Sequence, residues 1–201
     1  METQENKSPE TDGQGSAIKN IGAFVWDLVK ILIIALVIIV PFRMFVAEPF
    51  VVAGSSMLPN FHNHDYLIID RLSYITGNPR RGDVIVLKFP KDPSQFFIKR
   101  VIGLPGETIS LKQGYVVIAN DRQPEGLRLA ESYLPNQSQT FGQGAPVHLG
   151  SNEYFVLGDN RTASSDSRVW GILPRDLIVG KVWARVYPFS AAQFFHTPSY
   201  Q

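Results

Sequence analysis

The sequence predicts a mainly β domain, folded as a sandwich or an irregular β-barrel and tethered by one N-terminal transmembrane helix. Two observations lead to this fold class. One apolar segment near the N-terminus is long enough to cross a bilayer, and beyond it short apolar runs bounded by Gly, Pro, Asp or Asn replace any helical repeat. With 201 residues, 44% of them hydrophobic, the chain suffices for one compact domain and additional segments.

Residues 21–46 are predicted to form the transmembrane anchor. Residues 1–20 before them are polar and are expected to be a flexible cytoplasmic tail. Residues 23–42 supply about the 20 residues that a helix needs to cross the hydrocarbon core. The charges of Asp27 and Lys30 fall in the first turns, near the expected interface. A small excess of lysines before the apolar centre favours an N-terminus on the cytoplasmic side.

Two other interpretations of this apolar segment stay open. The first is a cleaved secretory signal peptide, against which stand the long acidic leader and the bulky Phe45 within Phe45-Val46-Ala47. The second is a buried core helix, because only residues 31–42 form a run without charge. The length and the flanks of the segment favour the transmembrane anchor.

Residues 47–201 are predicted to form the β-rich domain. Asn120-Asp121-Arg122 is typical of a hairpin turn, and the polar, Gly- and Pro-rich residues 122–149 are expected to be a small accessory excursion from the core. The expected strands lie in five apolar runs, at residues 66–69, 84–87, 114–118, 154–157 and 179–186.

The composition excludes several classes of chemistry. The absence of cysteine rules out thiol catalysis, disulfides and thiolate zinc sites. A net charge of +1 gives no reason to expect a nucleic-acid partner. His62 and His64 lie near Asp65, but no further ligand follows at a metal-site spacing, so a solvated loop is the better interpretation. We therefore expect no metal and no cofactor, and His148 and His196 are too isolated to predict a Ser-His-Asp triad.

Ser56 and Lys99 are the strongest candidates for a catalytic pair. Lys99 follows three apolar residues, 96–98, and a desolvated lysine can lose its proton and act as a base. The hydroxyl of Ser56 needs such a base to become a nucleophile. Lowering a lysine pKa by ~3 units costs about 4 kcal/mol, which burial and a hydrogen bond donated to the neutral amine could supply. Taken singly, Ser56 is equally consistent with a turn and Lys99 with a surface position.

Three segments together resemble type I signal peptidases, the membrane-bound enzymes that remove signal peptides from exported proteins. They are residues 54–59, the stretch from Arg81-Gly82-Asp83-Val84 to Gly106, and residues 158–168. The resemblance runs from the apolar segment to Trp170-Gly171. It implies a serine endopeptidase whose partners are signal peptides of exported preproteins and a lipid bilayer. It also implies a single-pass protein of the cell membrane, or of a thylakoid membrane, with its catalytic domain on the extracytoplasmic, periplasmic side.

The same resemblance assigns roles to individual residues. It implies that Ser56 is the nucleophile and Lys99 the general base, and that Ser164 hydrogen-bonds to the lysine. It implies that Asp166 and Arg168 form a structural ion pair beneath the site, which Arg100 could join. Small substrate side chains, as in Ala-x-Ala, are expected in shallow apolar pockets formed by Phe50, Val52, Met57, Leu67, Val86, Phe97 and Ile98.

The oxyanion hole is the part of the site for which the resemblance gives no complete answer. The backbone N–H of Ser56 is the natural first donor. Some members of the family place a serine two residues before the nucleophile as the second donor, but this chain has Gly54. Either another backbone N–H or the Ser55 hydroxyl must then serve.

Two further functions stay open at this point. One is a self-cleaving Ser/Lys protease of the repressor type, against which stand the apolar segment and the lack of a DNA-binding helical region. The other is a membrane-anchored β domain that binds exported proteins without catalysis. Loss of cleavage on substitution of Ser56 or Lys99 distinguishes a protease from such a binding domain.

Overall fold

The computed structural model describes residues 13–41, 47–135, 138–142 and 145–197. The chain divides into two compact units, residues 1–44 and 45–201. The first contains the helix α1 (Gly13–Pro41). The second contains the short helices α2 (Ser73–Thr76) and α3 (Ser167–Trp170), the 3-10 turns η2 (Arg175–Leu177) and η3 (Phe189–Ala191), and the strands β1 (Ala47–Val51), β2 (Tyr66–Asp70), β3 (Val84–Phe89), β4 (Asp92–Gly103), β5 (Thr108–Lys112), β6 (Tyr115–Asn120), β7 (Gln123–Arg128), β8 (Val147–His148), β9 (Glu153–Leu157), β10 (Leu173–Pro174), β11 (Ile178–Tyr187) and β12 (Gln193–Phe194).

Helix α1 begins earlier than the sequence predicts. Residues 13–20, assigned to the flexible tail, are helical, because a helix that has formed in the apolar segment extends at little cost through residues such as Ala17 and Lys19. From Phe24 to Ile39 its large apolar side chains are exposed. Among the described residues, no helix combines the length and the hydropathy that a membrane span requires. Residues 1–12 and 42–46 of the expected tail and anchor lie outside the described residues.

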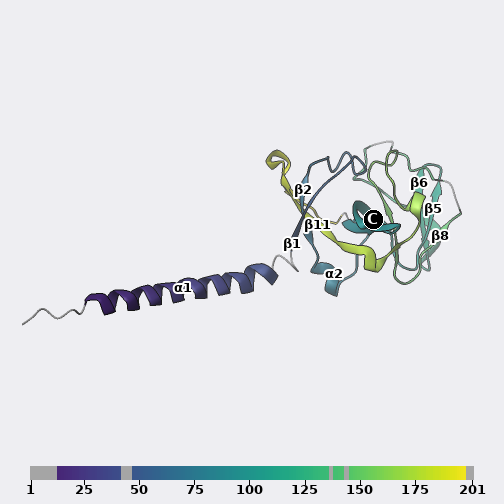
Figure 1. Ribbon diagram of the computed structural model, residues 1–201. Coiled ribbons are helices and arrows are strands. Elements are labelled where there is room, and N and C mark those ends of the chain that lie inside the picture. The colour runs from purple at the N-terminus through teal and green to yellow at the C-terminus, as the bar shows by residue number, and fades with distance from the viewer. Residues whose placement is uncertain (1–12, 42–46, 136–137, 143–144, 198–201) are drawn as a thin grey trace, which may run out of the picture. The chain divides into compact units, whose positions relative to one another are not determined.

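The strands form two antiparallel sheets. The larger sheet has the order β1-β2-β11-β3-β4-β9-β10, with β12 beside β11, and the smaller has the order β7-β6-β5-β8. Figure 1 shows β1, β2 and β11 at one side of the domain and β5, β6 and β8 at the other. The predicted mainly β fold is confirmed, but the sheets do not close into a barrel. Closure requires the edges to pair, and the edge strand β10 has only two residues, of which Pro174 has no N–H.

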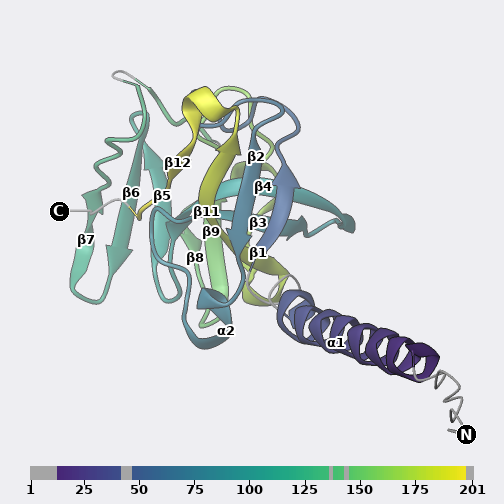
Figure 2. The same ribbon diagram turned by 90° about the vertical axis from the view of Figure 1, so that its left-hand side faces the viewer.

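The five apolar runs expected to be strands are all strands, namely β2, β3, β6, β9 and β11. Most of their buried apolar residues belong to three apolar clusters, which include Leu67 and Ile69, Ile85 and Val156, and Ile102 and Ile118 respectively. The expected hairpin turn joins β6 to β7 (Figure 2), where Asn120 Oδ1 accepts the N–H groups of the second and third residues beyond it.

The polar segment 122–149 is attached to the smaller sheet at both ends. Strand β7 pairs with β6, and β8 pairs with β5. Between these strands, Leu129 is buried in the third apolar cluster and Tyr133 packs against it. The segment therefore contributes to the apolar core, although its polar composition does not indicate this.

The pairing of β4 changes along its length. Its first part, from Asp92 onward, pairs with β3 alone, and β9 joins on the other side only from Arg100. At the far edge of the sheet, β1 pairs with β2 and has no strand on its other side among the described residues. Two unpaired backbone edges thus occur in the part of the domain that holds Lys99.

Candidate active site

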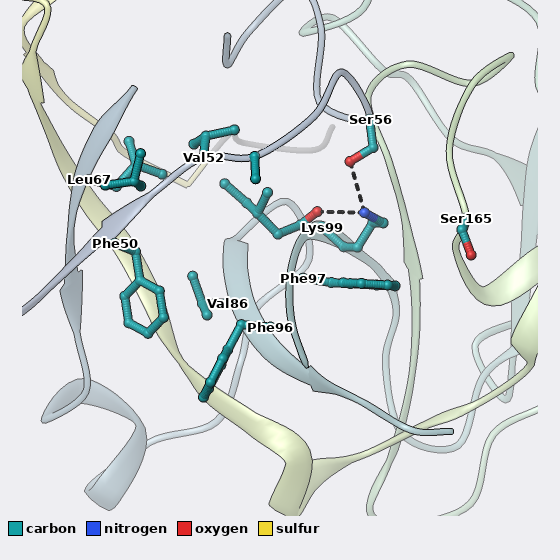
Figure 3. A pocket seen from close by; sticks show the side chains of 12 residues that line it. Phe50, Val52, Ser56, Leu67, Val86, Phe96, Phe97, Lys99 and Ser165 are labelled. Carbon is teal, nitrogen blue, oxygen red and sulfur yellow. Dashed lines mark hydrogen bonds between the residues drawn. The ribbon is translucent and has the colours of Figure 1, made fainter. Parts of the chain in front are cut away.

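A cleft of about 250 Å³ lies between β1 and β4 and contains both Ser56 and Lys99 (Figure 3). Six of the seven residues predicted for the substrate pockets line it, and Met57 does not. Met57 is 1% exposed and belongs to the core, where its sulfur accepts the backbone N–H of Asp159 at 3.4 Å. The lining consists of Phe50, Val51, Val52, Ala53, Ser56, Leu67, Val86, Phe96, Phe97, Ile98, Lys99 and Ser165.

Ser56 and Lys99 face each other across this cleft. Lys99 Nζ donates to Ser56 Oγ at 2.9 Å and to the backbone carbonyl of Ile98 at 2.9 Å. The ring of Phe97 lies beside the amine, with its centroid 5.1 Å from Nζ (Figure 3). The two residues come from a turn after β1 and from the middle of β4, 43 positions apart in the chain. The sequence prediction that these two side chains meet agrees with this geometry.

Burial lowers the pKa of Lys99 to about 8, and the negative charges of Asp166 and Asp159 oppose that shift. Only 3% of the residue is exposed, so the charged amine is deprived of most of its hydration. A pKa near 8 leaves a usable fraction of neutral amine at neutral pH. A neutral amine hydrogen-bonded to a serine hydroxyl can take the proton of that hydroxyl.

The turn that carries Ser56 is fixed from two sides. Gly54 adopts a φ of 100°, which favours glycine, and its N–H donates to Asn63 Oδ1 at 2.9 Å. The backbone N–H of Asn160 donates to the carbonyl of Ser56 at 3.0 Å, and its side-chain amide donates to the carbonyl of Ser55 at 3.1 Å. Among the described residues no acceptor receives the N–H of Ser56, which leaves this donor available to a ligand.

Asp166 organises the loop 158–168 beside the cleft. Its buried carboxylate accepts the N–H of Gly158 at 3.0 Å and two N–H groups of the Arg168 guanidinium, from Nε at 2.8 Å and from Nη2 at 2.7 Å. Burial alone would raise the pKa of Asp166, but these hydrogen bonds hold it below its usual value. Arg168 also donates to the carbonyl of Arg161 at 2.7 Å. The ion pair expected between Asp166 and Arg168 is therefore present.

Ser164 does not make the hydrogen bond expected from it. Its hydroxyl is buried and has no hydrogen-bond partner among the described residues, although it lies close enough to Asp166 to help lower the pKa of that carboxylate. The donors of Lys99 are directed instead at Ser56 and at the carbonyl of Ile98. Ser164 Oγ packs against Gly158, so closely that a β-carbon on Gly158 would overlap it.

A second buried ion pair, which the sequence did not predict, lies behind the cleft. Arg100 donates to both carboxylate oxygens of Asp159, at 2.8 and 2.6 Å, and to the carbonyl of Gly82 at 2.9 Å. Asn60 donates to the same carboxylate at 2.8 Å. Arg100 thus pairs with Asp159. The available signal was Asp159 in Gly158-Asp159-Asn160, an acidic residue of the segment 158–168 for which the sequence suggested no partner.

Comparison with known proteins gives consistent results along most of the chain. A family model described as "Signal peptidase, peptidase S26" matches residues 25–187. The "Probable signal peptidase I-1" of Synechocystis sp. is 38% identical, over 88% of this chain and 90% of the relative. The "Signal peptidase I" of Leptolyngbya laminosa is 40% identical, over 80% of this chain and 78% of the relative. A crystal structure of a signal peptidase I from Enterococcus faecalis is 30% identical and covers 52% of this chain and 97% of that one, with a TM-score of 0.43.

The residues that these comparisons match include the turn of Ser56, strand β4 and the loop 158–168. This chain therefore belongs to the signal peptidase family, peptidase S26.

Proposed function

We propose that this chain is a serine endopeptidase that removes N-terminal signal peptides from exported preproteins, with Ser56 as nucleophile and Lys99 as general base. The observation that carries the proposal is the 2.9 Å contact between Lys99 Nζ and Ser56 Oγ inside an apolar cleft. Membership of the signal peptidase family supplies the substrate class. The lowered pKa of Lys99 supports its role as the base.

In the proposed mechanism, neutral Lys99 takes the proton of Ser56 as Oγ attacks the scissile carbonyl. The protonated lysine then gives that proton to the leaving amine, which departs as the new N-terminus of the mature protein. Water enters next, and Lys99 takes a proton from it as the hydroxide attacks the acyl-enzyme. Return of that proton to Ser56 Oγ regenerates the starting pair.

The tetrahedral intermediate needs donors for its oxyanion, and the unengaged N–H of Ser56 is the first of them. The N–H of Gly54 is already donated to Asn63, so it does not supply the second. Ser55 is exposed beside the nucleophile, and we assign its hydroxyl to this position.

The preference for small side chains follows from the shape of the cleft. Its aromatic and branched walls leave about 250 Å³ for several substrate side chains together. Phe50 and Phe96 stand 5.5 Å apart, centroid to centroid, and narrow it at one end (Figure 3). The unpaired edges of β1 and β4 offer backbone donors and acceptors to an extended peptide. An Ala-x-Ala sequence placed between them fits these walls.

The direct test is cleavage of a preprotein with an Ala-x-Ala site by the full chain in detergent micelles, followed by electrophoresis and N-terminal sequencing. We expect a cut after the second Ala. Ser56→Ala should give no product, while Ser151→Ala, which changes an exposed serine outside the cleft, should cleave at the wild-type rate. Replacing the second Ala of the substrate with Leu should slow cleavage by at least about tenfold. Cleavage by Ser56→Ala at the wild-type rate would contradict the proposal.

The same proposal places the protein in the cell membrane, or in a thylakoid membrane, with residues 21–46 as its anchor and the N-terminus in the cytoplasm. Support comes from the exposed apolar side chains between Phe24 and Ile39. The charges of Asp27 and Lys30 partly cancel, because their side chains meet at 3.1 Å. Carbonate washing of membranes from expressing cells should leave the chain in the pellet. Its release into the supernatant would contradict an anchor.

A further inference from the structure

We propose that Glu131 and Tyr133, in the polar segment 122–149, are positioning residues that hold the three catalytic elements in register. This inference deepens the proposed Ser56–Lys99 mechanism and rests on it. The three elements are the turn after Ser56, strand β4 with Lys99, and the loop 158–168. Residues 131–133 contact all of them, although the described residues of the segment supply no side chain to the cleft.

The first contact is with the loop 158–168, through Arg161. The guanidinium of Arg161 donates two hydrogen bonds to Glu131, at 2.8 and 2.5 Å, and another to the hydroxyl of Thr140. The hydroxyl of Tyr133 accepts a fourth at 3.3 Å and donates to Glu131 at 2.6 Å. The fifth donor, Nε, reaches the carbonyl of Gly158 at 3.1 Å. Every donor of the guanidinium is thereby used.

This arrangement fixes the backbone at Gly158, which is packed directly behind the nucleophile. A β-carbon at Gly158 would overlap the carbonyl oxygen of Ser56 and the hydroxyl of Ser164. The side chain of Arg161 is 2% exposed and that of Glu131 is 11% exposed. Burial alone would lower the pKa of Arg161, but the bonds and charge of Glu131 raise it, so the guanidinium stays charged and held.

The second and third contacts come from Tyr133. Its ring lies on the guanidinium of Arg100, 4.0 Å from centroid to Cζ, and Arg100 is the neighbour of Lys99 on β4. Its carbonyl accepts the side-chain amide of Asn60 at 2.9 Å, and Asn60 lies four residues after Ser56. Residues 131–133 therefore contact, from outside the cleft, all three elements that carry or adjoin Ser56 and Lys99. These contacts hold the distance between Ser56 Oγ and Lys99 Nζ.

The test compares two buried glutamates in the full chain in detergent micelles. Glu107 makes a similar buried ion pair with Arg81 at 2.5 Å, with side chains 8% and 16% exposed, and neither residue lines the cleft. Both Glu131→Gln and Glu107→Gln should lower the melting temperature. Only Glu131→Gln should also lower kcat for a signal-peptide substrate, by about 10- to 100-fold, with KM changed less than about threefold.

The pH dependence of kcat/KM separates a positioning role from a purely structural one, because a loss of stability alone does not shift it. A loosened site admits water to Lys99, which faces the carboxylates of Asp166 and Asp159. The rising limb of kcat/KM against pH should then move to higher pH in Glu131→Gln and stay in place in Glu107→Gln. Where Glu131→Gln does not fold, Tyr133→Phe serves as the second variant. It removes only the hydroxyl that bonds to Glu131 and Arg161, and it should lower kcat by about 3- to 10-fold.

Equal kcat values for Glu131→Gln, Glu107→Gln and the wild type would overturn the inference, as would equal losses in the two glutamate variants. Failure of the proposed function has a different signature. An active Ser56→Ala variant overturns the mechanism and this inference with it. An inactive Ser56→Ala beside a fully active Glu131→Gln overturns the positioning role alone.

Discussion

Lys99→Arg is expected to lower kcat/KM for a signal-peptide substrate by about 10³-fold or more. The substitution keeps a long cationic side chain on β4, but a guanidinium does not deprotonate at any pH at which the protein is folded. Ser56 then has no base, even though a hydrogen-bond donor still lies beside its hydroxyl. The measurement is a cleavage assay with the full chain in detergent, at pH 7 and again at pH 9.

The wild-type pH profile is the matching control for this substitution. Because the reactive form is the neutral amine and the pKa of Lys99 is lowered to about 8, kcat/KM should rise with pH and level off above about pH 8. Below that value it should fall by about tenfold per pH unit. Lys88→Arg, at an exposed lysine of β3 outside the cleft, should keep both rate and profile. Substantial activity in Lys99→Arg, or a profile centred near pH 10, would contradict the role of Lys99.

Gly158→Ala is expected to lower kcat/KM by about 10²-fold and to reduce the melting temperature. The added β-carbon would overlap the carbonyl oxygen of Ser56 and the hydroxyl of Ser164, so one of these groups must move. Overpacking of this kind costs about 1–3 kcal/mol, and misplacing a reacting group by about 1 Å costs about 10²-fold in rate. Cleavage kinetics and thermal unfolding, measured on the same preparation, separate the two effects.

Gly180→Ala is the matched control for Gly158→Ala. A β-carbon at Gly180 would lie 2.7 Å from the backbone carbonyl oxygen of Asp70, in the pairing of β11 with β2 and outside the cleft. It should reduce the melting temperature by a similar amount and leave kcat nearly unchanged. Equal losses of kcat in the two variants would show that crowding at Gly158 acts only through global stability.

The sequence was sufficient to predict that Ser56 and Lys99 meet and that Asp166 pairs with Arg168, because each lies in a short segment whose order resembles a known family. The apolar residues before Lys99 also predicted its burial. Other features depend on contacts between distant segments. The pairing of Arg161 with Glu131 joins residues 30 positions apart across a polar stretch, and no local pattern marks it.

The same limit explains the individual errors. Met57 lies next to Ser56 in the chain, but its side chain packs into the core. Side chains alternate between the two faces of a strand, but Met57 lies in a turn, so this alternation could not predict the direction of its side chain. For Ser164, the resemblance predicted a partner, whereas the direction of its hydroxyl depends on packing against Gly158. The sequence left a sandwich and an irregular barrel both open, because barrel closure depends on whether distant edges pair, and the edge strand β10 has only two residues.

The change of pairing along β4 limits which substrates can be cut. The pairing of β4 with β9 begins at Arg100, so among the described residues no strand pairs with β4 beside Lys99, opposite the unpaired edge of β1. An occupant of that position must be extended and must have its own backbone groups free. A cleavage junction that is already helical, or already paired within a folded mature protein, is expected to resist cleavage whatever its side chains. We therefore expect cleavage to depend on the folding state of the substrate as well as on its sequence, and nascent or freshly translocated chains to be cut in preference to folded ones.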